Sequence, residues 1–247
     1  MGVVFSVFTK NYCSNNKIPH NLSPFFSLLY HSKKRNLTLE LGKSTFELLP
    51  EKALFFEDEK ALLLSDLHLG KSRHFRRNGL AVPGGESVAT LSLLNKLIVD
   101  TSAEKVFFLG DLFHSSINAD WQLLREFIHS FKQVEFYLIR GNHDLFESDF
   151  YRESGITVCD EFVLRADIVL KNEGNALDQK LVICGHLHPA FRLKGKGRQS
   201  IKMPCFYLKP PLLILPAFGE FTGSKIVEKG KDCRVFVCAE RQVFEVT

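Results

Sequence analysis

The sequence predicts an α/β protein, an α+β sandwich of two mixed β-sheets flanked by helices. Up to residue 139, short apolar runs alternate with two amphipathic helical stretches. That order is typical of a mainly parallel sheet with helices on its faces. In the second half the helical pattern fades and strand-sized apolar runs follow one another, which indicates a second, more antiparallel sheet. Apolar content of 45% and charged content of 24% are those of a globular protein, not of a disordered or fibrous chain.

The amino-terminal region differs in composition from everything after it. Residues 1–36 are rich in Asn and Ser and end in a basic run. We expect a poorly ordered extension there and one domain over residues 37–247. From residue 37, apolar and polar residues alternate in two short stretches, which predicts a half-exposed hairpin that leads to an apolar run at residues 53–56.

Residues 61–64 are all apolar and are followed at once by polar residues. A fully buried strand has this pattern, although a short buried helix has it too. Two later runs, residues 106–109 and 134–139, are read as strands in the same way. The helix before the first of them has an apolar face of Val88, Leu91, Leu94, Leu97 and Ile98.

A second helix is predicted between the two later strands, with an apolar face of Trp121, Leu124, Phe127, Ile128 and Phe131. Either Asn118 or Asp120 could cap its start. The strand-sized runs of the second half are residues 162–164, 168–170, 181–184, 205–208, 212–215, 234–237 and 243–246.

Charge and cysteine content narrow the functional classes. The net charge is only +4, so nucleic-acid binding must be argued from where the basic residues lie. Six cysteines without a CxxC pair favour reduced thiols in a cytoplasmic protein. No apolar run has the length of a membrane-spanning helix, and we expect no membrane association.

Four of the apolar runs end in residues that can bind metal ions. In open α/β sheets, ligands gather at the carboxyl ends of the strands, so these clusters are placed where a shared site would form. A single His at a strand end is more often a structural residue, but four such clusters together indicate a metal centre. The clusters are Asp66 and His68; Asp111; Asn142, His143 and Asp144; and His186 and His188.

The motifs D-L-H at 66–68, G-D at 110–111, G-N-H-D at 141–144 and G-H-L-H at 185–188 resemble the signature of the calcineurin-like metallophosphoesterases. Longer stretches (DLHLGKSRHFRRNG, FLGDLFHS, GHLHPAF and LPAFGEFTG) resemble the bacterial ligase-associated DNA damage response endonucleases of the PdeM type. The second resemblance covers nearly everything from residue 37 onward. It implies the metallophosphoesterase fold and a role with a DNA ligase and a helicase in processing damaged DNA.

The resemblance also implies a role for each cluster. Two divalent ions would activate a water and neutralise the oxygens of a phosphoryl displacement. Mixed Asp, Asn and His ligation suits Mn²⁺ best in our interpretation, with Fe or Zn²⁺ as alternatives. His143 would act as an acid or phosphate stabiliser, oriented by Asp144. Asp66, His68 and His188 would hold one metal, Asn142 and His186 the other, and Asp111 would bridge them.

The chain departs from the family pattern at one position. Family members carry another His between the third and fourth motifs, whereas this chain has none there, and the best match puts Asn172 in its place. An amide oxygen can bind a hard cation but is a weaker donor than imidazole to transition metals. We therefore expect a weakened second metal site.

Basic residues follow the first and last motifs. They are either two solvated loops or the borders of one cleft that fits a phosphate backbone. The candidate substrate residues are Arg73, His74, Arg76, Arg77 and His114.

The leading hypothesis is a metal-dependent phosphodiesterase or nuclease that acts on DNA in repair. The alternatives are a phosphatase or phosphodiesterase for small nucleotides, because the fold does not set the substrate, and a degenerate binding module, toward which only Asn172 points. The sequence leaves the oligomeric state open.

Overall fold

The computed structural model describes residues 35–71, 84–113, 119–175, 180–195, 199–220 and 222–247. Contacts between Cα atoms divide the chain into residues 1–33 and 34–247, and all described residues belong to the second unit. The extension predicted for residues 1–36 therefore lies outside the described residues, apart from its last two. Of these, Arg35 pairs its backbone with Gln242 and Arg241 near the carboxyl end of the chain.

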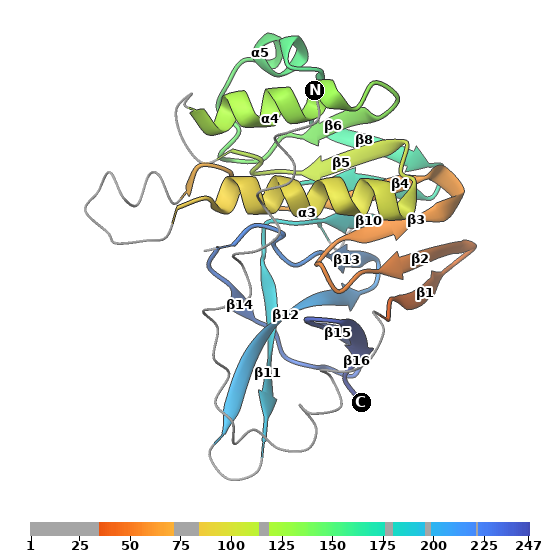
Figure 1. Ribbon diagram of the computed structural model, residues 1–247. Coiled ribbons are helices and arrows are strands. Elements are labelled where there is room, and N and C mark those ends of the chain that lie inside the picture. Colours follow the sequence, from red (N-terminus) through yellow and green to blue (C-terminus); the bar gives the residue numbers. More distant parts are fainter. Residues whose placement is uncertain (1–34, 72–83, 114–118, 176–179, 196–198, 221) are drawn as a thin grey trace. The chain divides into compact units, whose positions relative to one another are not determined.

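The first sheet has seven strands, which lie in the order of the sequence (Figure 1). Strands β1 to β4 pair antiparallel, and β4 to β7 pair parallel. The predicted hairpin is β1–β2, in which Leu39 pairs with Phe46. The strands are β1 (Leu37–Leu41), β2 (Ser44–Leu48), β3 (Leu54–Phe56), β4 (Ala61–Leu64), β5 (Lys105–Leu109), β6 (Glu135–Ile139) and β7 (Ile156–Cys159).

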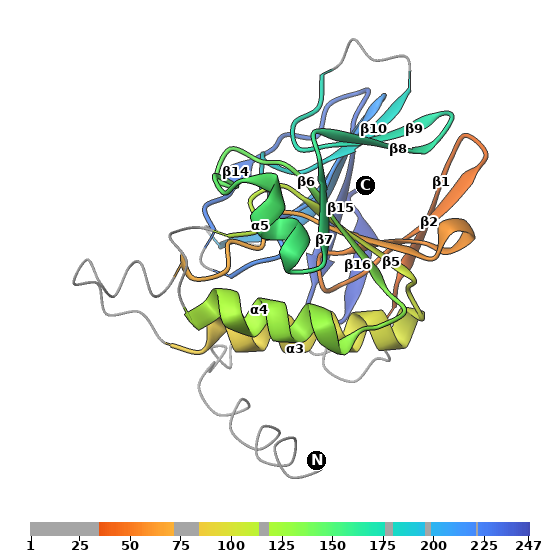
Figure 2. The same cartoon turned by 90° about the horizontal axis from the view of Figure 1, so that it is seen from above.

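Helices cover one face of this sheet. Helices α3 (Glu86–Thr101) and α4 (Ala119–Ser130) lie side by side there (Figure 2). Short elements η1 (Glu57–Glu59) and α5 (Ser148–Glu153) follow β3 and β6. The second sheet covers the other face, so the predicted sandwich of two sheets flanked by helices is confirmed. The sequence of β4 is wholly apolar because both faces of the strand are buried. Leu62 and Leu64 pack toward the helices, whereas Ala61 and Leu63 pack toward the second sheet.

The second sheet is mixed, as predicted. Strands β9, β10 and β13 run parallel, and most other pairs are antiparallel. Large side chains from both sheets, such as Phe46, Phe107 and Phe206, fill the space between them. The strands are β8 (Glu161–Arg165), β9 (Ile168–Lys171), β10 (Leu181–Cys184), β11 (Pro189–Lys194), β12 (Ser200–Lys209), β13 (Leu212–Ile214), β14 (Lys225–Ile226), β15 (Arg234–Ala239) and β16 (Gln242–Glu245).

Several local predictions need correction. Strand β7 was missed because its four residues follow a short helix and carry little pattern. Strand β11 and the start of β12 were missed because basic residues interrupt their apolar pattern, and they form a hairpin where a solvated loop was one alternative. Asp120 lies inside the first turn of α4 and does not cap it. Asn118 lies outside the described residues.

Two compositional expectations can be compared with the structure. All five cysteines in the described part of the chain are free thiols. No helix within the described ranges is long and apolar enough to cross a membrane.

Candidate metal centre

The motif residues lie where parallel strands of the first sheet end. Strands β4, β5 and β6 are parallel neighbours, so the segments that follow them emerge at one edge of the sheet. Backbone hydrogen bonds tie the first two segments together: Asp66 N donates to Gly110 O at 3.2 Å, and His68 N donates to Asp111 O at 2.9 Å. The D-L-H and G-D motifs thus form one backbone unit.

The segment after β13 joins the second sheet to this unit. The backbone amides of Phe218 and Gly219 donate to the carbonyls of Ser65 and Asp66, at 2.8 and 3.2 Å. The hydroxyl of Ser65 donates to the carbonyl of Pro216 at 3.2 Å. Sequence reasoning missed this role of residues 215–219, although the run LPAFG was visible as part of the family resemblance.

Gly185 lets the fourth motif approach the first. A Cβ atom at this position would lie 2.4 Å from Cβ of Ser65 and 2.7 Å from Oδ2 of Asp66, which no side chain can accept. The next residue, His186, donates its backbone N–H to the same Oδ2 at 3.0 Å. The glycine of G-H-L-H is therefore required for the two sheets to meet at the site.

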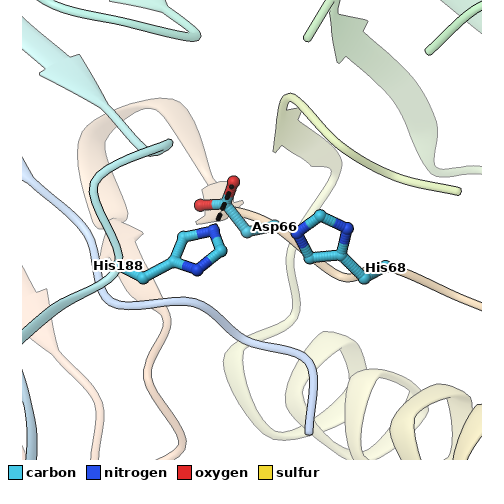
Figure 3. A group of neighbouring side chains, drawn as sticks. All are labelled: Asp66, His68 and His188. Atoms are coloured by element: carbon cyan, nitrogen blue, oxygen red, sulfur yellow. Dashed lines mark ion pairs between the residues drawn. The ribbon is translucent and has the colours of Figure 1, made fainter. Parts of the chain in front are cut away.

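Asp66, His68 and His188 form a cluster that could hold a metal ion (Figure 3). Their nearest ligand atoms all lie within 4.8 Å of one another. Nε2 of His188 is 3.1 Å from Oδ1 of Asp66. Nε2 of His68 is 3.8 Å from Oδ2 of Asp111, so the carboxylate predicted to bridge two metals borders this cluster. Asp66, His68 and Asp111 are all buried.

The hydrogen bonding of His188 prepares it to bind a cation. Its Nδ1–H donates to the carbonyl of Gly223 at 3.0 Å, which leaves Nε2 directed at Asp66. Burial lowers the pKa of His188, but the hydrogen bond and charge of the Asp66 carboxylate outweigh it and raise that pKa overall. Nε2 of His188 thus faces the Asp66 carboxylate, at the position where a metal ion would be bound.

The backbone of the site is strained. Among the described residues, eight non-glycine residues have a positive φ, and five of them are predicted metal ligands. Such conformations cost about 1–3 kcal/mol each and persist only where the surrounding structure enforces them. Of these residues, Asp66, His68 and His188 point toward one another, and no sequence pattern revealed their backbone conformations. The five are Asp66 (φ 53°), His68 (φ 48°), Asp111 (φ 48°), His186 (φ 65°) and His188 (φ 49°).

Asp144 fixes the loop that carries His143. Its two carboxylate oxygens accept hydrogen bonds from the backbone amides of Leu112 (3.0 Å) and Gly141 (2.9 Å). Burial raises the pKa of Asp144 to about 6, against the opposing effect of those amides. His143 donates its backbone N–H to Oδ1 of Asp111 at 3.0 Å. Its exposed ring lies 5.6 Å from the ring of His68, measured between centroids.

The remaining predicted residues are distributed as follows. Asn142 is exposed beside His143, and His186 is half-buried, with its backbone N–H bonded to Asp66. The substrate candidates Arg73, His74, Arg76, Arg77 and His114 lie outside the described residues. Their roles, like those of the other site residues, stay predictions.

The residues present fit divalent metal ions. One carboxylate and two imidazoles, with a second carboxylate beside them, are a donor set that Mn²⁺, Fe or Zn²⁺ accepts. The buried amide oxygen Oδ1 of Asn172 has no hydrogen-bond partner within the described residues, and such an atom is satisfied by a cation.

Comparison with known proteins agrees with this fit. A family model described as calcineurin-like phosphoesterase matches residues 60–178. The nuclease MPE of Pseudomonas putida is 30% identical, has a TM-score of 0.74, and the match covers 86% of this chain and 100% of that chain. A search of the curated proteins found no match.

Two other solved structures match at low TM-scores. Yfce, a phosphoesterase from E. coli, is 13% identical (TM-score 0.38; 75% of this chain, 97% of that one). A protein of unknown function from Aquifex aeolicus is 16% identical (TM-score 0.35; 56% of this chain, 82% of that one). Neither carries weight beside the nuclease and the family model. From the family model and the match to the nuclease, together with the metal cluster, we conclude that the chain belongs to the calcineurin-like phosphoesterase family and is a hydrolase that acts on phosphoester bonds.

Proposed function

We propose that this chain is a metal-dependent phosphodiesterase that cleaves DNA. The observation that carries the proposal is the cluster of Asp66, His68 and His188 beside Asp111, in a chain 30% identical to a nuclease over that nuclease's whole length. Bound divalent ions, which we propose to be Mn²⁺, would activate water and neutralise the charge that develops on the phosphoryl oxygens.

The protein's own residues position the reacting groups. Asp66, His68 and His188 would hold one metal, Asn142 and His186 would help to hold the second, and the Asp111 carboxylate would be available to both. His143 is exposed at the edge of the cluster, where it can donate a proton to the departing alkoxide. Asp144 keeps the His143 loop in place through its bonds to Leu112 and Gly141.

The hairpin β11–β12 supports a polymeric substrate. Strand β11 begins directly after His188, and its exposed Arg192 is the cross-strand partner of exposed Lys202. Lys194 is exposed two residues further along. Like charges directly opposite each other destabilise a hairpin, and no described carboxylate forms an ion pair with any of the three. A polyanion would remove that repulsion.

The position of these charges favours DNA over a small nucleotide as the proposed substrate. At about 3.3 Å per residue, Arg192 lies about 13 Å along β11 from His188. A mononucleotide whose phosphate is bound at the metal cluster does not extend that far. The backbone of a DNA strand does. We propose that the basic residues after Gly70, which the sequence places after the first motif, also contact the DNA backbone.

The biological setting belongs to the proposal as well. The family resemblance supports a role in DNA repair together with a DNA ligase and a helicase, in the cytoplasm. Co-purification of the tagged chain with a ligase or a helicase from cells treated with a DNA-damaging agent would test the partners.

The activity is tested with four substrates and supplied Mn²⁺: a phosphodiester reporter, a phosphomonoester reporter, single-stranded DNA and double-stranded DNA. We expect cleavage of the diester reporter and of DNA, lost in Asp111→Ala. Hydrolysis of the monoester alone would instead identify a small-nucleotide phosphatase. No turnover with any divalent metal would overturn the enzymatic proposal and favour a binding module.

The role of the hairpin is tested separately with the double variant Arg192→Gln/Lys202→Gln. We expect a higher KM and a weaker salt dependence for DNA cleavage and unchanged cleavage of the small diester reporter. The matched control is Lys43→Gln/Lys132→Gln, which removes two exposed lysines, one in the β1–β2 turn and one before the amino end of β6, away from the site. Equal effects of both variants on DNA cleavage would refute the assignment.

A further inference from the structure

Asn172 is held beside the loop that carries His186. It follows β9, whose parallel neighbour β10 leads into the G-H-L-H motif. The carbonyl of Asn172 accepts a hydrogen bond from the backbone N–H of Gly185 at 3.0 Å. Its backbone therefore occupies a fixed position at the same edge as the metal motifs.

The side chain of Asn172 reaches across to the first sheet. A Cβ atom on Gly110, which has a φ of 82°, would lie 1.9 Å from Oδ1 and 2.6 Å from Cγ of Asn172. The amide thus rests against the backbone that immediately precedes Asp111. Its Oδ1 is buried and accepts no hydrogen bond from the described residues.

An unpaired buried amide oxygen is costly unless something else satisfies it. Gly141, the residue before Asn142, also packs at this place, since a Cβ atom there would lie 2.4 Å from Oδ1 of Asp111. The free oxygen of Asn172 and the carboxylate of Asp111 therefore both lie against the touching backbones of Gly110 and Gly141. A cation bound by Asp111 on this side would find an oxygen donor already in place.

We propose that Asn172 binds the second metal through Oδ1 and shifts the preference of that site away from Zn²⁺ and toward a hard cation such as Mn²⁺ or Mg²⁺. With Asn172, the second site has two amides, one carboxylate and one imidazole, from Asn142, Asn172, Asp111 and His186. The first site keeps two imidazoles. Imidazole is the better donor to Zn²⁺ and amide oxygen suits harder cations, so the two sites differ in both affinity and preference, and the first fills before the second.

This proposal rests on the two-metal site of the proposed function, but metal binding is measurable without any substrate, so the two can fail separately. The full chain is stripped with a chelator and dialysed against Zn²⁺ or Mn²⁺ at a series of concentrations, and bound metal per chain is measured by mass spectrometry. We expect one tight Zn²⁺ and a second at least about tenfold weaker, a difference of ~1.4 kcal/mol. Electron paramagnetic resonance of the Mn²⁺-loaded chain should show two coupled ions.

Three variants sharpen the test. Asn172→His should tighten the second Zn²⁺ by about tenfold or more, whereas Asn172→Ala should lose the second Mn²⁺. Asn172→Asp keeps the shape and the oxygen donor and should retain the second Mn²⁺, which guards against a folding defect in the alanine variant. Asn95→His, on the exposed face of α3, controls for Zn²⁺ bound by any added surface histidine. Two equally tight Zn²⁺ ions in the unchanged chain, or Mn²⁺ binding by Asn172→Ala that equals the unchanged chain's, would overturn the proposal.

Discussion

Nε2 of His188 lies 3.1 Å from Oδ1 of Asp66, although the two residues belong to segments that extend different sheets. Asp66 leaves the first sheet after β4, and His188 precedes β11 in the second. Neither sheet alone supplies all three residues of the candidate cluster. The proposed chemistry therefore depends on how tightly the two sheets are joined at this edge.

We expect His188→Gln to abolish tight binding of the first metal and to lower kcat/KM for a diester reporter by about 100-fold or more. The glutamine keeps a polar side chain of similar size but removes the imidazole that faces Asp66. Metal content and turnover should be measured on the same preparation. His129→Gln, which changes an exposed histidine of α4, should leave both unchanged. Full metal content in the His188 variant would contradict the assignment.

Metal binding should raise the melting temperature of the chain. A metal that binds only the folded state adds about 2.7 kcal/mol of stability at one hundred times its Kd, which corresponds to about 5–10 °C for a chain of this size. Scanning calorimetry of chelator-treated and Mn²⁺-loaded protein measures the shift. The double variant Asp66→Asn/His188→Gln should show almost none, and an undiminished shift in that variant would mean that Mn²⁺ stabilises the chain elsewhere.

Gly185→Ala should destabilise the fold by about 1–3 kcal/mol through overpacking and should lower turnover as well. The added Cβ would lie 2.4 Å from Cβ of Ser65, so the first and fourth motifs must separate. Urea unfolding gives the loss of stability. At Gly230 the nearest atom to an added Cβ is Sγ of Cys233, at an ordinary 3.6 Å. Gly230→Ala is therefore the matched control, and equal effects of the two would show that the close approach at Gly185 is not limiting.

Asp144→Asn should cost about 1–3 kcal/mol of stability, because one of the two buried backbone amides would then face an NH₂ group instead of a carboxylate oxygen. Loosening of the His143 loop should lower kcat more than it changes KM. Asp149→Asn, which weakens an exposed ion pair with Arg152, should change stability by less than about 0.5 kcal/mol. A normal kcat in a folded Asp144→Asn protein would remove Asp144 from the positioning role.

The sequence was sufficient for most of the fold and for the types of residue at the site. Each buried strand of the first sheet reads as a continuous apolar run because both its faces are covered, and polar residues mark its end. The hydrophobic pattern did not predict β7 and β11. Strand β7 has only four residues, and basic residues interrupt the apolar pattern of β11, so neither shows a clear periodicity.

Only the tertiary structure decided which of these residues meet. The strained backbone at Asp66 and Asp111, the close approach at Gly185 and the bonds from residues 215–219 to Ser65 all arise from contacts between distant segments. From the sequence, Asn172 could be seen only as a missing histidine. The structure shows a buried oxygen against Gly110 that accepts no hydrogen bond from the described residues, because packing of one sheet edge on another determines where that side chain ends.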